Sequence, residues 1–432
     1  MDVLRRALHH AEQYLEGLDR APVAPTADLA TMRRQLLKPL GDGPLPPDQV
    51  IDELVADCQG GIMGSAGGRF FAWVIGGAVP AALAADWLTS TWDQNAGIYA
   101  AGPAAAVVEE VVGAWLKDLL GLPAAASFAL VTGCQMAHVT CLAAARDAAG
   151  AGVRIICGET THGTVDRAIR LLGMGGSRIV PGLLNPGNLA AELEREPDRP
   201  AIVVLQAGEL NTGAYDSFEE LIPIARAHKA WVHVDGAFGL WAAVSRKHRH
   251  LLKGVEQADS WATDGHKWLN VPYDCGYAFV KDSNAHRAAM SRHESYLIHD
   301  DDARDQVDWN PEFSRRARGF PTYAALRQLG RSGLEELVER CCELARQLVL
   351  GIGALPGAEV LCEPTLNQGL LRFGNDDEFT DQVIGRVVQS GEAFFGGVNW
   401  RGRRAMRVSV CNWRTTAADV ERVTAAFAAI LQ

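Results

Sequence analysis

The sequence predicts an α/β protein with a large domain, built on a mostly parallel sheet covered by helices, and a smaller α+β domain at the C-terminus. From Ser127 onward, short apolar runs rich in β-branched residues alternate with helical patterns, as in βαβ units. Near Arg331 the pattern changes to a long helix followed by short strands and further helices, which suits a smaller α+β domain. The chain has 432 residues, 48% of them hydrophobic, and is long enough for more than one domain.

The N-terminal part of the chain is helical in pattern and interrupted by prolines. We expect residues 1–60 to form an arm that packs on another body, such as a second subunit. Residues 61–325 form the expected large domain. Its helix AAAVVEEVVGAWLKDLLGL directs one apolar face toward the core. That face holds Val108, Val111, Val112, Trp115 and Leu119.

The strands expected in the large domain are SFALVTG, VRIICGE, AIVVLQAG, AWVHVDG, ADSWAT and CGYAFVK. The helices expected between them are QMAHVTCLAAARDAA, TVDRAIRLLG and FEELIPIARAH. Such apolar strands are typical of a parallel sheet that is buried on both faces. In the small domain, residues 326–432, we expect the strands AEVLC, GLLRF and AMRVSV and the helices GLEELVERCCELARQLVLGI, FTDQVIGRVVQSG and TAADVERVTAAFAAIL.

Charge and composition exclude several classes of protein. The formal net charge is -11, and the basic cluster around Arg401–Arg407 is too local for a nucleic-acid surface. No stretch approaches the roughly 20 apolar residues that span a bilayer, and the N-terminus lacks the apolar core of a signal peptide. We therefore expect a cytoplasmic protein that binds neither nucleic acid nor membrane. Nine cysteines without a C-x-x-C pair indicate free thiols and no metal site.

The ends of the predicted parallel strands are where a ligand is expected. After SFALVTG, the helix begins near Cys134 and Gln135, so its first backbone N–H groups would face an anion such as a phosphate. Thr132 and Gly133 complete this turn. Any strand-to-helix turn favours small residues, so this turn alone does not distinguish a phosphate site from an ordinary connection.

Two further strand ends carry polar side chains. After VRIICGE come His162 and Thr164, and His162 is either a hydrogen-bonded loop imidazole or a ring stacked on a flat ligand. After AWVHV comes Asp235, a carboxylate that is costly to bury unless it meets a cation. The small Ala237 beside it leaves room for a flat ligand.

The segment WATDGHKWLNVPYDCG contains Lys267 between His266 and Trp268. In an aromatic, partly desolvated site, we expect the pKa of this lysine to be lowered and its neutral amine to be nucleophilic. A phosphate turn, a flat imidazole, a strand-end carboxylate and a buried amine together match the needs of one cofactor, pyridoxal 5'-phosphate.

The segments HVDGAFG (233–239) and DGHKWLNVPYDCG (264–276) resemble the group II pyridoxal-phosphate-dependent amino-acid decarboxylases of the aspartate-aminotransferase fold, fold type I. The resemblance runs from about Gly68 to the C-terminus and includes TGCQMAHVTCLAAARD and MRVSVCNWRTTAADVERV. These motifs are highly specific for the fold and the cofactor and much less so for the reaction. The resemblance implies a pyridoxal-phosphate enzyme with an amino-acid substrate and a homodimer with its active site at the interface.

The resemblance also assigns roles. It implies that Lys267 is the internal aldimine lysine, that Asp235 pairs with the pyridine nitrogen, that His162 stacks on the ring and that Ala237 packs on the opposite face. The groups implied around the phosphate are Thr132, Gly133, Cys134, Gln135, Thr164, Asp264 and His266. Arg407 would bind the substrate carboxylate, although a strand-end arginine can also pair with a nearby carboxylate. Phe71 and Trp73 are candidate walls of the substrate pocket, or plain core residues.

We expect decarboxylation, with transamination or a lyase reaction at Cα–Cβ or Cβ–X as alternatives. A binding protein without catalysis is disfavoured because Lys267, Asp235 and His162 are all present. Two features depart from the family pattern. Glu209 and Leu210 replace a pair of threonines, and Glu209 would add negative charge near the cofactor unless it turns away. The loop 298–313 contains no tyrosine to protonate the substrate carbanion, although Tyr296 lies just upstream.

Overall fold

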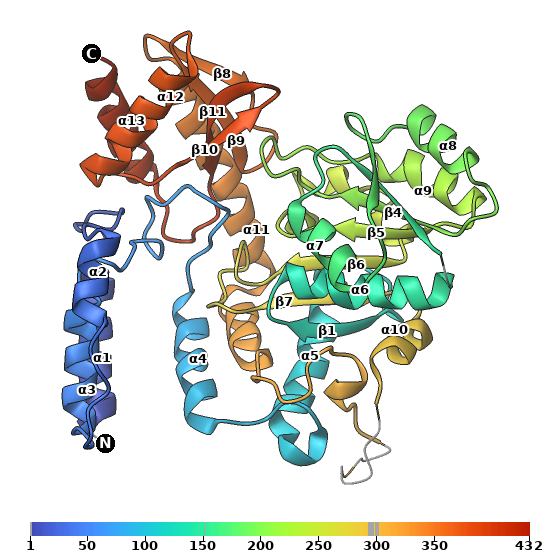
Figure 1. Ribbon diagram of the computed structural model, residues 1–432, viewed down its shortest axis with the longest axis horizontal. Coiled ribbons are helices and arrows are strands. Elements are labelled where there is room, and N and C mark those ends of the chain that lie inside the picture. The colour runs from blue at the N-terminus through green and yellow to red at the C-terminus, as the bar shows by residue number, and fades with distance from the viewer. Residues whose placement is uncertain (1, 151, 293–297, 299–301) are drawn as a thin grey trace. The chain divides into compact units, whose positions relative to one another are not determined.

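A computed structural model describes residues 2–150, 152–292, 298 and 302–432 of the chain (Figure 1). It divides into two compact units. The first unit comprises Met1–Ile75, Leu344–Glu363 and Gly369–Gln432, and the second comprises Gly76–Glu343 and Pro364–Gln368. The division expected from the sequence, with boundaries after residues 60 and 325, stays a prediction. Among the described residues, no helix is both long and apolar enough to cross a membrane.

The second unit is built on a seven-stranded sheet with the order β1-β7-β6-β5-β4-β2-β3 (Figure 1). Its strands are β1 (Ser127–Val131), β2 (Arg154–Gly158), β3 (Ser177–Val180), β4 (Ala201–Gln206), β5 (Trp231–Asp235), β6 (Ser260–Asp264) and β7 (Gly276–Val280). The strands from β6 to β3 run parallel, whereas β7 is antiparallel to both β1 and β6. The carboxyl ends of β5 and β6 therefore lie at the same edge of the sheet.

The second unit also contains helices, most of which pack on this sheet. They are α4 (Pro80–Trp92), α5 (Pro103–Leu119), α6 (Cys134–Ala149), α7 (Gly163–Leu171), α8 (Pro186–Glu194), α9 (Phe218–Ala227) and α10 (Ser283–Met290). The short 3-10 helices are η1 (Tyr99–Ala101), η2 (Gly239–Val244), η3 (Arg249–Leu252), η4 (Val255–Gln257) and η5 (Gln306–Asp308). Small residues of α6, including Ala137 and Ala144, pack directly on Ala262 and Ala278 of the strands, which brings the helix close to the sheet.

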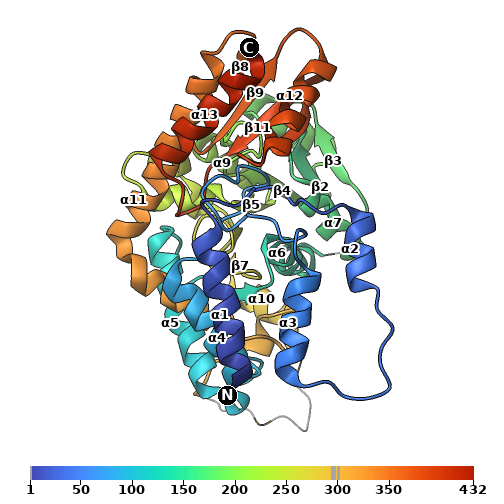
Figure 2. The same cartoon turned by 90° about the vertical axis from the view of Figure 1, so that its left-hand side faces the viewer.

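The first unit holds a four-stranded sheet with the order β10-β11-β9-β8. Its strands are β8 (Ala358–Cys362), β9 (Gln368–Phe373), β10 (Gly396–Trp400) and β11 (Arg403–Ser409), and its helices are α1 (Asp2–Gly17), α2 (Leu29–Leu36), α3 (Pro47–Asp57), α12 (Asp377–Ser390) and α13 (Ala417–Leu431). Figure 2 shows α1 and α3 side by side, where Arg6 and His10 contact Asp52. Helix α11 (Gly319–Gly353) contributes to both units and is interrupted at Gly330.

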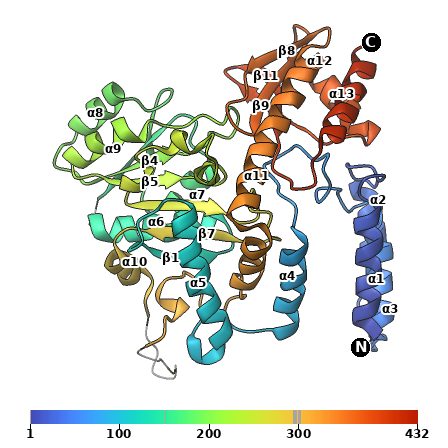
Figure 3. The same cartoon turned by 180° about the vertical axis from the view of Figure 1, so that it is seen from behind.

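The predicted strands and helices are present, and the mostly parallel sheet confirms the predicted fold class. The edge strand β3, the strand β10 and the helices α4, α8 and α10 were not predicted. The predicted core face of α5 is wrong in part. Figure 3 shows α5 beside β1, and of the five residues expected on that face only Val112 is buried. The buried stripe includes Glu109, because its carboxylate is paired 2.6 Å from the Arg315 guanidinium inside the core.

Candidate active site

Three polar side chains meet at the carboxyl edge formed by β5 and β6. Asp235 is the last residue of β5, Asp264 is the last residue of β6, and Lys267 lies in the turn that follows. The register pairs Asp235 with Ala262, so the two strands end within two residues of each other. The sequence predicted this convergence because parallel strands that alternate with helices end at one edge.

The Asp264 carboxylate connects the lysine turn to the start of α6. Its Oδ2 lies 3.1 Å from the Lys267 Nζ, and its Oδ1 accepts a 2.6 Å hydrogen bond from the Cys134 backbone N–H. His266 Nε2 lies 3.4 Å from the same Oδ1. Asp264 is buried, whereas Lys267 keeps 20% of its side chain exposed. This carboxylate therefore holds the partly exposed amine next to the N-terminus of α6.

The pKa of Lys267 differs from the sequence-based expectation. Burial lowers it, as expected, but the carboxylates of Asp264 and Asp235 raise it, and the net direction is a raised pKa. The prediction of a lowered pKa is therefore wrong for the chain on its own, because two anions outweigh the loss of solvent. In the chain without cofactor, Lys267 therefore carries a proton at neutral pH.

Residues before α4 hold the lysine turn in place. The Gly77 N–H donates to Asn270 Oδ1 at 2.8 Å, and the Val79 N–H donates to the Asn270 carbonyl at 2.9 Å. A Cβ on Gly76 would lie 1.9 Å from the Lys267 carbonyl oxygen, so only glycine fits there. Sequence analysis missed this contact, although the Gly76–Gly77 pair was a signal that two backbones approach closely.

Asp235 is buried and surrounded by donors. Its Oδ1 accepts from the Ala237 N–H at 3.2 Å and lies 3.6 Å from His138 Nε2. Burial raises the pKa of the Asp235 carboxyl, but His138, His162 and Lys267 lower it, and the net direction is a lowered pKa. Asp235 is therefore ionised at neutral pH, as a partner for a cation requires.

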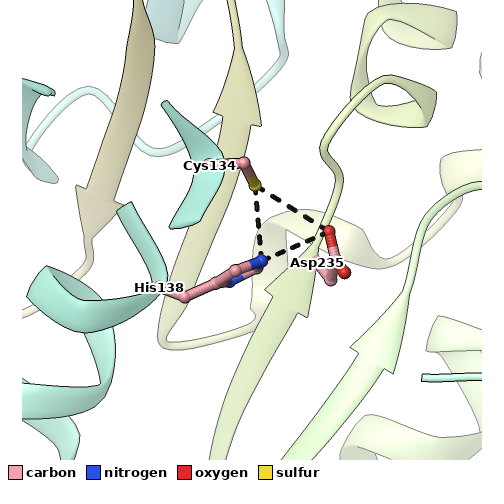
Figure 4. Close-up of side chains that lie close together, drawn as sticks. All are labelled: Cys134, His138 and Asp235. Atoms are coloured by element: carbon pink, nitrogen blue, oxygen red, sulfur yellow. Dashed lines mark hydrogen bonds and ion pairs between the residues drawn. The ribbon is translucent and has the colours of Figure 1, made fainter. Parts of the chain in front are cut away.

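Cys134 and His138 complete a tight group around Asp235, which Figure 4 shows. The sulfur, imidazole and carboxylate atoms of the three residues all lie within 4.8 Å of one another. Burial raises the pKa of the Cys134 thiol and lowers that of His138, so both are neutral. Sequence analysis missed His138, although its place four residues after Cys134 put both on one face of the predicted helix.

The start of α6 forms the turn expected to hold a phosphate. A Cβ on Gly133 would lie 2.9 Å from His266 Cε1, so this turn packs too closely on the His266 ring to carry a side chain. Gln135 Nε2 donates to the Thr164 carbonyl at 3.1 Å, whereas Gln135 Oε1 is buried without a hydrogen-bond partner in the described structure. The Cys134 N–H already donates to Asp264. The next N–H, that of Gln135, has no acceptor inside the helix because it belongs to the first helical turn.

His162 caps the N-terminus of α7 after β2. Its Nδ1 accepts from the Thr164 N–H at 3.2 Å and lies 2.8 Å from the Thr164 hydroxyl. Because Nδ1 is an acceptor, the hydrogen of the neutral ring is on Nε2. The ring is exposed. Because β2 runs parallel to β4 and β4 to β5, the loop after β2 that carries His162 lies at the same edge of the sheet as the end of β5.

Glu209 is turned into its own loop and is buried. Its carboxylate accepts from Asn211 Nδ2 at 2.7 Å and from both the backbone N–H and the hydroxyl of Thr212 at 2.8 Å. These bonds occupy the carboxylate. The loop hydrogen bonds explain how a charged residue replaces the paired threonines that the family pattern favours.

The three residues expected at the substrate lie in the first unit. Phe71 is fully buried, with its ring 5.2 Å from that of Phe395, so it is a core residue. Trp73 is 53% exposed and lies 5.3 Å from the Phe394 ring. Arg407 is half-buried on β11. Tyr296 and residues 299–301 of the expected catalytic loop lie outside the described residues.

Comparison with known proteins identifies the family. The pyridoxal-dependent decarboxylase conserved domain matches residues 31–373, and the chain belongs to this family. An aromatic-L-amino-acid decarboxylase of Bacillus atrophaeus is 25% identical over 95% of this chain and 91% of its own. An L-2,4-diaminobutyrate decarboxylase of Rhizobium meliloti (strain 1021) is 31% identical over 80% of this chain and 74% of its own.

The same comparison confirms the fold. The crystal structure of Oryza sativa TDC with PLP and tryptamine superposes with a TM-score of 0.93 at 23% identity, covering 100% of this chain and 98% of that one. The predictions of a fold type I enzyme, of pyridoxal phosphate as the cofactor and of an amino-acid carboxy-lyase are confirmed.

Proposed function

We propose that the chain decarboxylates an L-amino acid with an aromatic side chain, and that Lys267, Asp235 and His162 act directly on the cofactor and the substrate. One observation carries the proposal. A protonated amine, an ionised carboxylate and the first turn of a helix converge at one sheet edge. Parallel α/β sheets bind their ligands at this edge.

The residues at this edge fit pyridoxal phosphate. Lys267 offers an amine, Asp235 an anion, and the first turn of α6 offers N–H groups directly after Gly133, which packs too closely on His266 to carry a side chain. Pyridoxal phosphate, when bound, reacts with amines and withdraws electrons from the bonds at the substrate Cα. The chain's own residues would position the cofactor and the substrate for that chemistry.

Each strand-end residue has a proposed task. Asp235, kept ionised, holds the ring nitrogen of the cofactor protonated. His162 covers one face of the ring, and Ala237 packs on the other because a larger side chain would fill that space. The groups proposed around the phosphate are Thr132, Gly133, Cys134, Gln135, Thr164, Asp264 and His266, with the Gln135 N–H in the leading role because that of Cys134 is engaged by Asp264.

Lys267 also supplies the proton that replaces the lost carboxylate on the substrate Cα. Residues 298–313 contain no tyrosine that could supply it. The raised pKa of Lys267 provides an ammonium group at this sheet edge at neutral pH. The Asp264 carboxylate pairs with the Lys267 Nζ at 3.1 Å and orients it. Proton delivery by the His162 Nε2–H is the alternative left by the geometry.

The substrate proposal rests on the relatives and on one aromatic surface. The Bacillus relative named as an aromatic-L-amino-acid decarboxylase aligns with nearly the whole chain. Trp73 is exposed and packs against Phe70 and Phe394, which makes it the proposed wall for an aromatic side chain. The buried Phe71 has no exposed surface to offer a substrate. Arg407 is proposed to bind the substrate carboxylate.

We also propose a cytoplasmic homodimer. Support for the dimer comes from the helices α1, α2 and α3, in which no residue is buried within the single chain. Large apolar side chains on these helices are exposed, namely Leu4, Leu8, Leu29, Leu36, Val50, Leu54 and Val55. Helices of this composition gain stability by packing on a second surface, and a second copy of the chain provides one. Sedimentation of the full chain as a monomer would exclude the dimer.

Product analysis tests the proposed reaction. The purified protein loaded with pyridoxal phosphate is given a mixture of L-amino acids that includes aromatic ones and 2,4-diaminobutyrate, with and without an oxo acid. We expect aromatic amines, formed without the oxo acid and detected by mass spectrometry. Formation of 1,3-diaminopropane alone would replace the proposed substrate class, and oxo acids formed only with the acceptor would replace decarboxylation by transamination.

A further inference from the structure

A line of buried polar contacts runs from Asp235 into the core of the second unit, and its links beyond His138 are hydrogen bonds. His138 Nε2 lies 3.6 Å from Asp235 Oδ1, and His138 Nδ1 lies 2.9 Å from His233 Nε2. His233 Nδ1 lies 2.9 Å from the Ser260 hydroxyl, which accepts a 2.9 Å hydrogen bond from Trp231 Nε1. The line joins α6, β5 and β6, and its beginning is visible in Figure 4.

The strand pattern places these groups together. Trp231, His233 and Asp235 alternate along β5 and so point to the same face of the sheet, the face on which α6 packs. His233 is paired in register with Ser260 of β6. His138, His233 and Ser260 are all fully buried. The line therefore lies in the core, where its bonds are strong and an unpaired group is costly.

The two histidines are neutral. Burial lowers the pKa of His138, and burial together with the neighbouring His138 lowers the pKa of His233 to about 3. A neutral imidazole has one nitrogen that donates and one that accepts. Each ring therefore accepts a hydrogen bond at one nitrogen and donates one from the other.

The Asp235 charge determines that direction. A lone pair on His138 Nε2 would face the carboxylate and be repelled, so Nε2 carries the hydrogen. His138 Nδ1 must then accept from His233 Nε2–H, and His233 Nδ1 must accept from the Ser260 hydroxyl. The Ser260 oxygen in turn accepts from Trp231 Nε1–H. Every donor in the line then points toward Asp235.

Cys134 shares the last hydrogen of the line. Its sulfur lies 3.4 Å from His138 Nε2 and 3.9 Å from Asp235 Oδ1. A neutral thiol is a weak acceptor compared with a carboxylate. The stronger electrostatic interaction of the His138 N–H is therefore with Asp235.

We propose that His138 and His233 are positioning residues, which orient the Asp235 carboxylate and keep it ionised so that it can hold the ring nitrogen of the cofactor protonated. This inference rests on the proposed role of Asp235. Aligned donors polarise one another and stabilise a negative charge at the end of the line. Groups that support metal ligands in a comparable way change metal affinity or activity by about 10–100-fold, and we expect an effect of similar size here.

The first test measures where the ring hydrogens are. We expect nitrogen NMR of the full-length protein labelled with nitrogen-15 histidine to show His138 and His233 both neutral with the hydrogen on Nε2. Signals are assigned with His138→Gln and His233→Gln. A hydrogen on Nδ1 of either ring, or a positively charged ring, would overturn the inference, whatever the cofactor does.

The second test measures how strongly the protein prefers the ring nitrogen. The full chain is loaded with pyridoxal phosphate or with an analogue in which carbon replaces that nitrogen, and the two dissociation constants are compared. We expect His138→Leu to reduce the preference for pyridoxal phosphate by about tenfold or more, and His138→Gln, which keeps an N–H donor, to restore part of it.

The control is another fully buried histidine, His286, which bonds Ser127 Oγ at 2.8 Å and the Trp309 carbonyl at 2.9 Å. His286→Leu should lower stability and leave the preference unchanged. An unchanged preference in His138→Leu would overturn the inference and leave the role of Asp235 standing. A wild-type protein without any preference would instead remove the role of Asp235, and the inference with it.

Discussion

Asp264 Oδ2 lies 3.1 Å from the Lys267 Nζ, and this carboxylate is a main reason that the pKa of the lysine is raised rather than lowered. The same Asp264 side chain binds the N-terminus of α6 through the Cys134 N–H. One carboxylate thus links the amine of the site to the helix that is proposed to face the phosphate.

Removing that charge tests the link. In Asp264→Asn we expect the pKa of Lys267 in the cofactor-free chain to fall, because burial then acts with less opposition. The rate at which Lys267 is acetylated, followed by mass spectrometry across pH, should reach half its maximum at a lower pH. Glu339→Gln is the control, since Glu339 raises the pKa of Lys247. An unchanged Lys267 profile would show that Asp264 does not control this amine.

Replacing Asp235 tests the proposed electron withdrawal. Asp235→Asn keeps the shape of the side chain and removes the charge that is proposed to hold the ring nitrogen protonated. We expect the variant to retain cofactor and to lose at least about a hundredfold in kcat, as is typical when a preorganised electrostatic group is removed. Asp259→Asn, before the start of β6, is the control. Near-normal turnover in Asp235→Asn would refute the assignment.

The contact between Gly76 and the lysine turn is tight enough to be tested by one methyl group. In Gly76→Ala the new Cβ would overlap the Lys267 carbonyl oxygen at 1.9 Å, so the backbone must shift. We expect a loss of about 1–3 kcal/mol in the free energy of unfolding and weaker cofactor binding. Gly385→Ala, where the structure leaves open space, should be neutral or stabilising. Equal behaviour of the two variants in chemical denaturation would contradict the geometry.

Buried Asp216 makes stability depend on pH. Burial raises the pKa of this carboxyl from 3.8 to about 6, so the folded state holds its proton to higher pH than the unfolded state. The stability present at low pH is then lost as pH rises from about 4 to 6. Asp216→Asn lacks this loss and keeps an acceptor for the Gln206 N–H. We expect its advantage over the wild type to grow to about 2–3 kcal/mol across that window and then stay constant. An advantage that does not change with pH would be contrary to this account.

The strand ends could be predicted from the sequence because alternating strands and helices leave few topologies. Asp235 was found because it ends a predicted strand, and Lys267 because it lies just after the next one. The edge strand β3 was missed because its residues Ser177–Val180 are partly exposed and lack an apolar run. The spacing of Cys134 and His138 places both on one face of the predicted helix, but it does not show that this face points at the end of β5. The direction of the Lys267 pKa depends on distances to two carboxylates, which no spacing along the chain provides.

Lys267 is the residue proposed to hold the cofactor. The most direct measurement is to reduce the protein loaded with pyridoxal phosphate with borohydride and to map the modified peptide by mass spectrometry. We expect the phosphopyridoxyl mass on Lys267, and its absence from the same peptide of Lys267→Ala. A label on another lysine in the wild-type protein, with Lys267 unmodified, would contradict the assignment of the site.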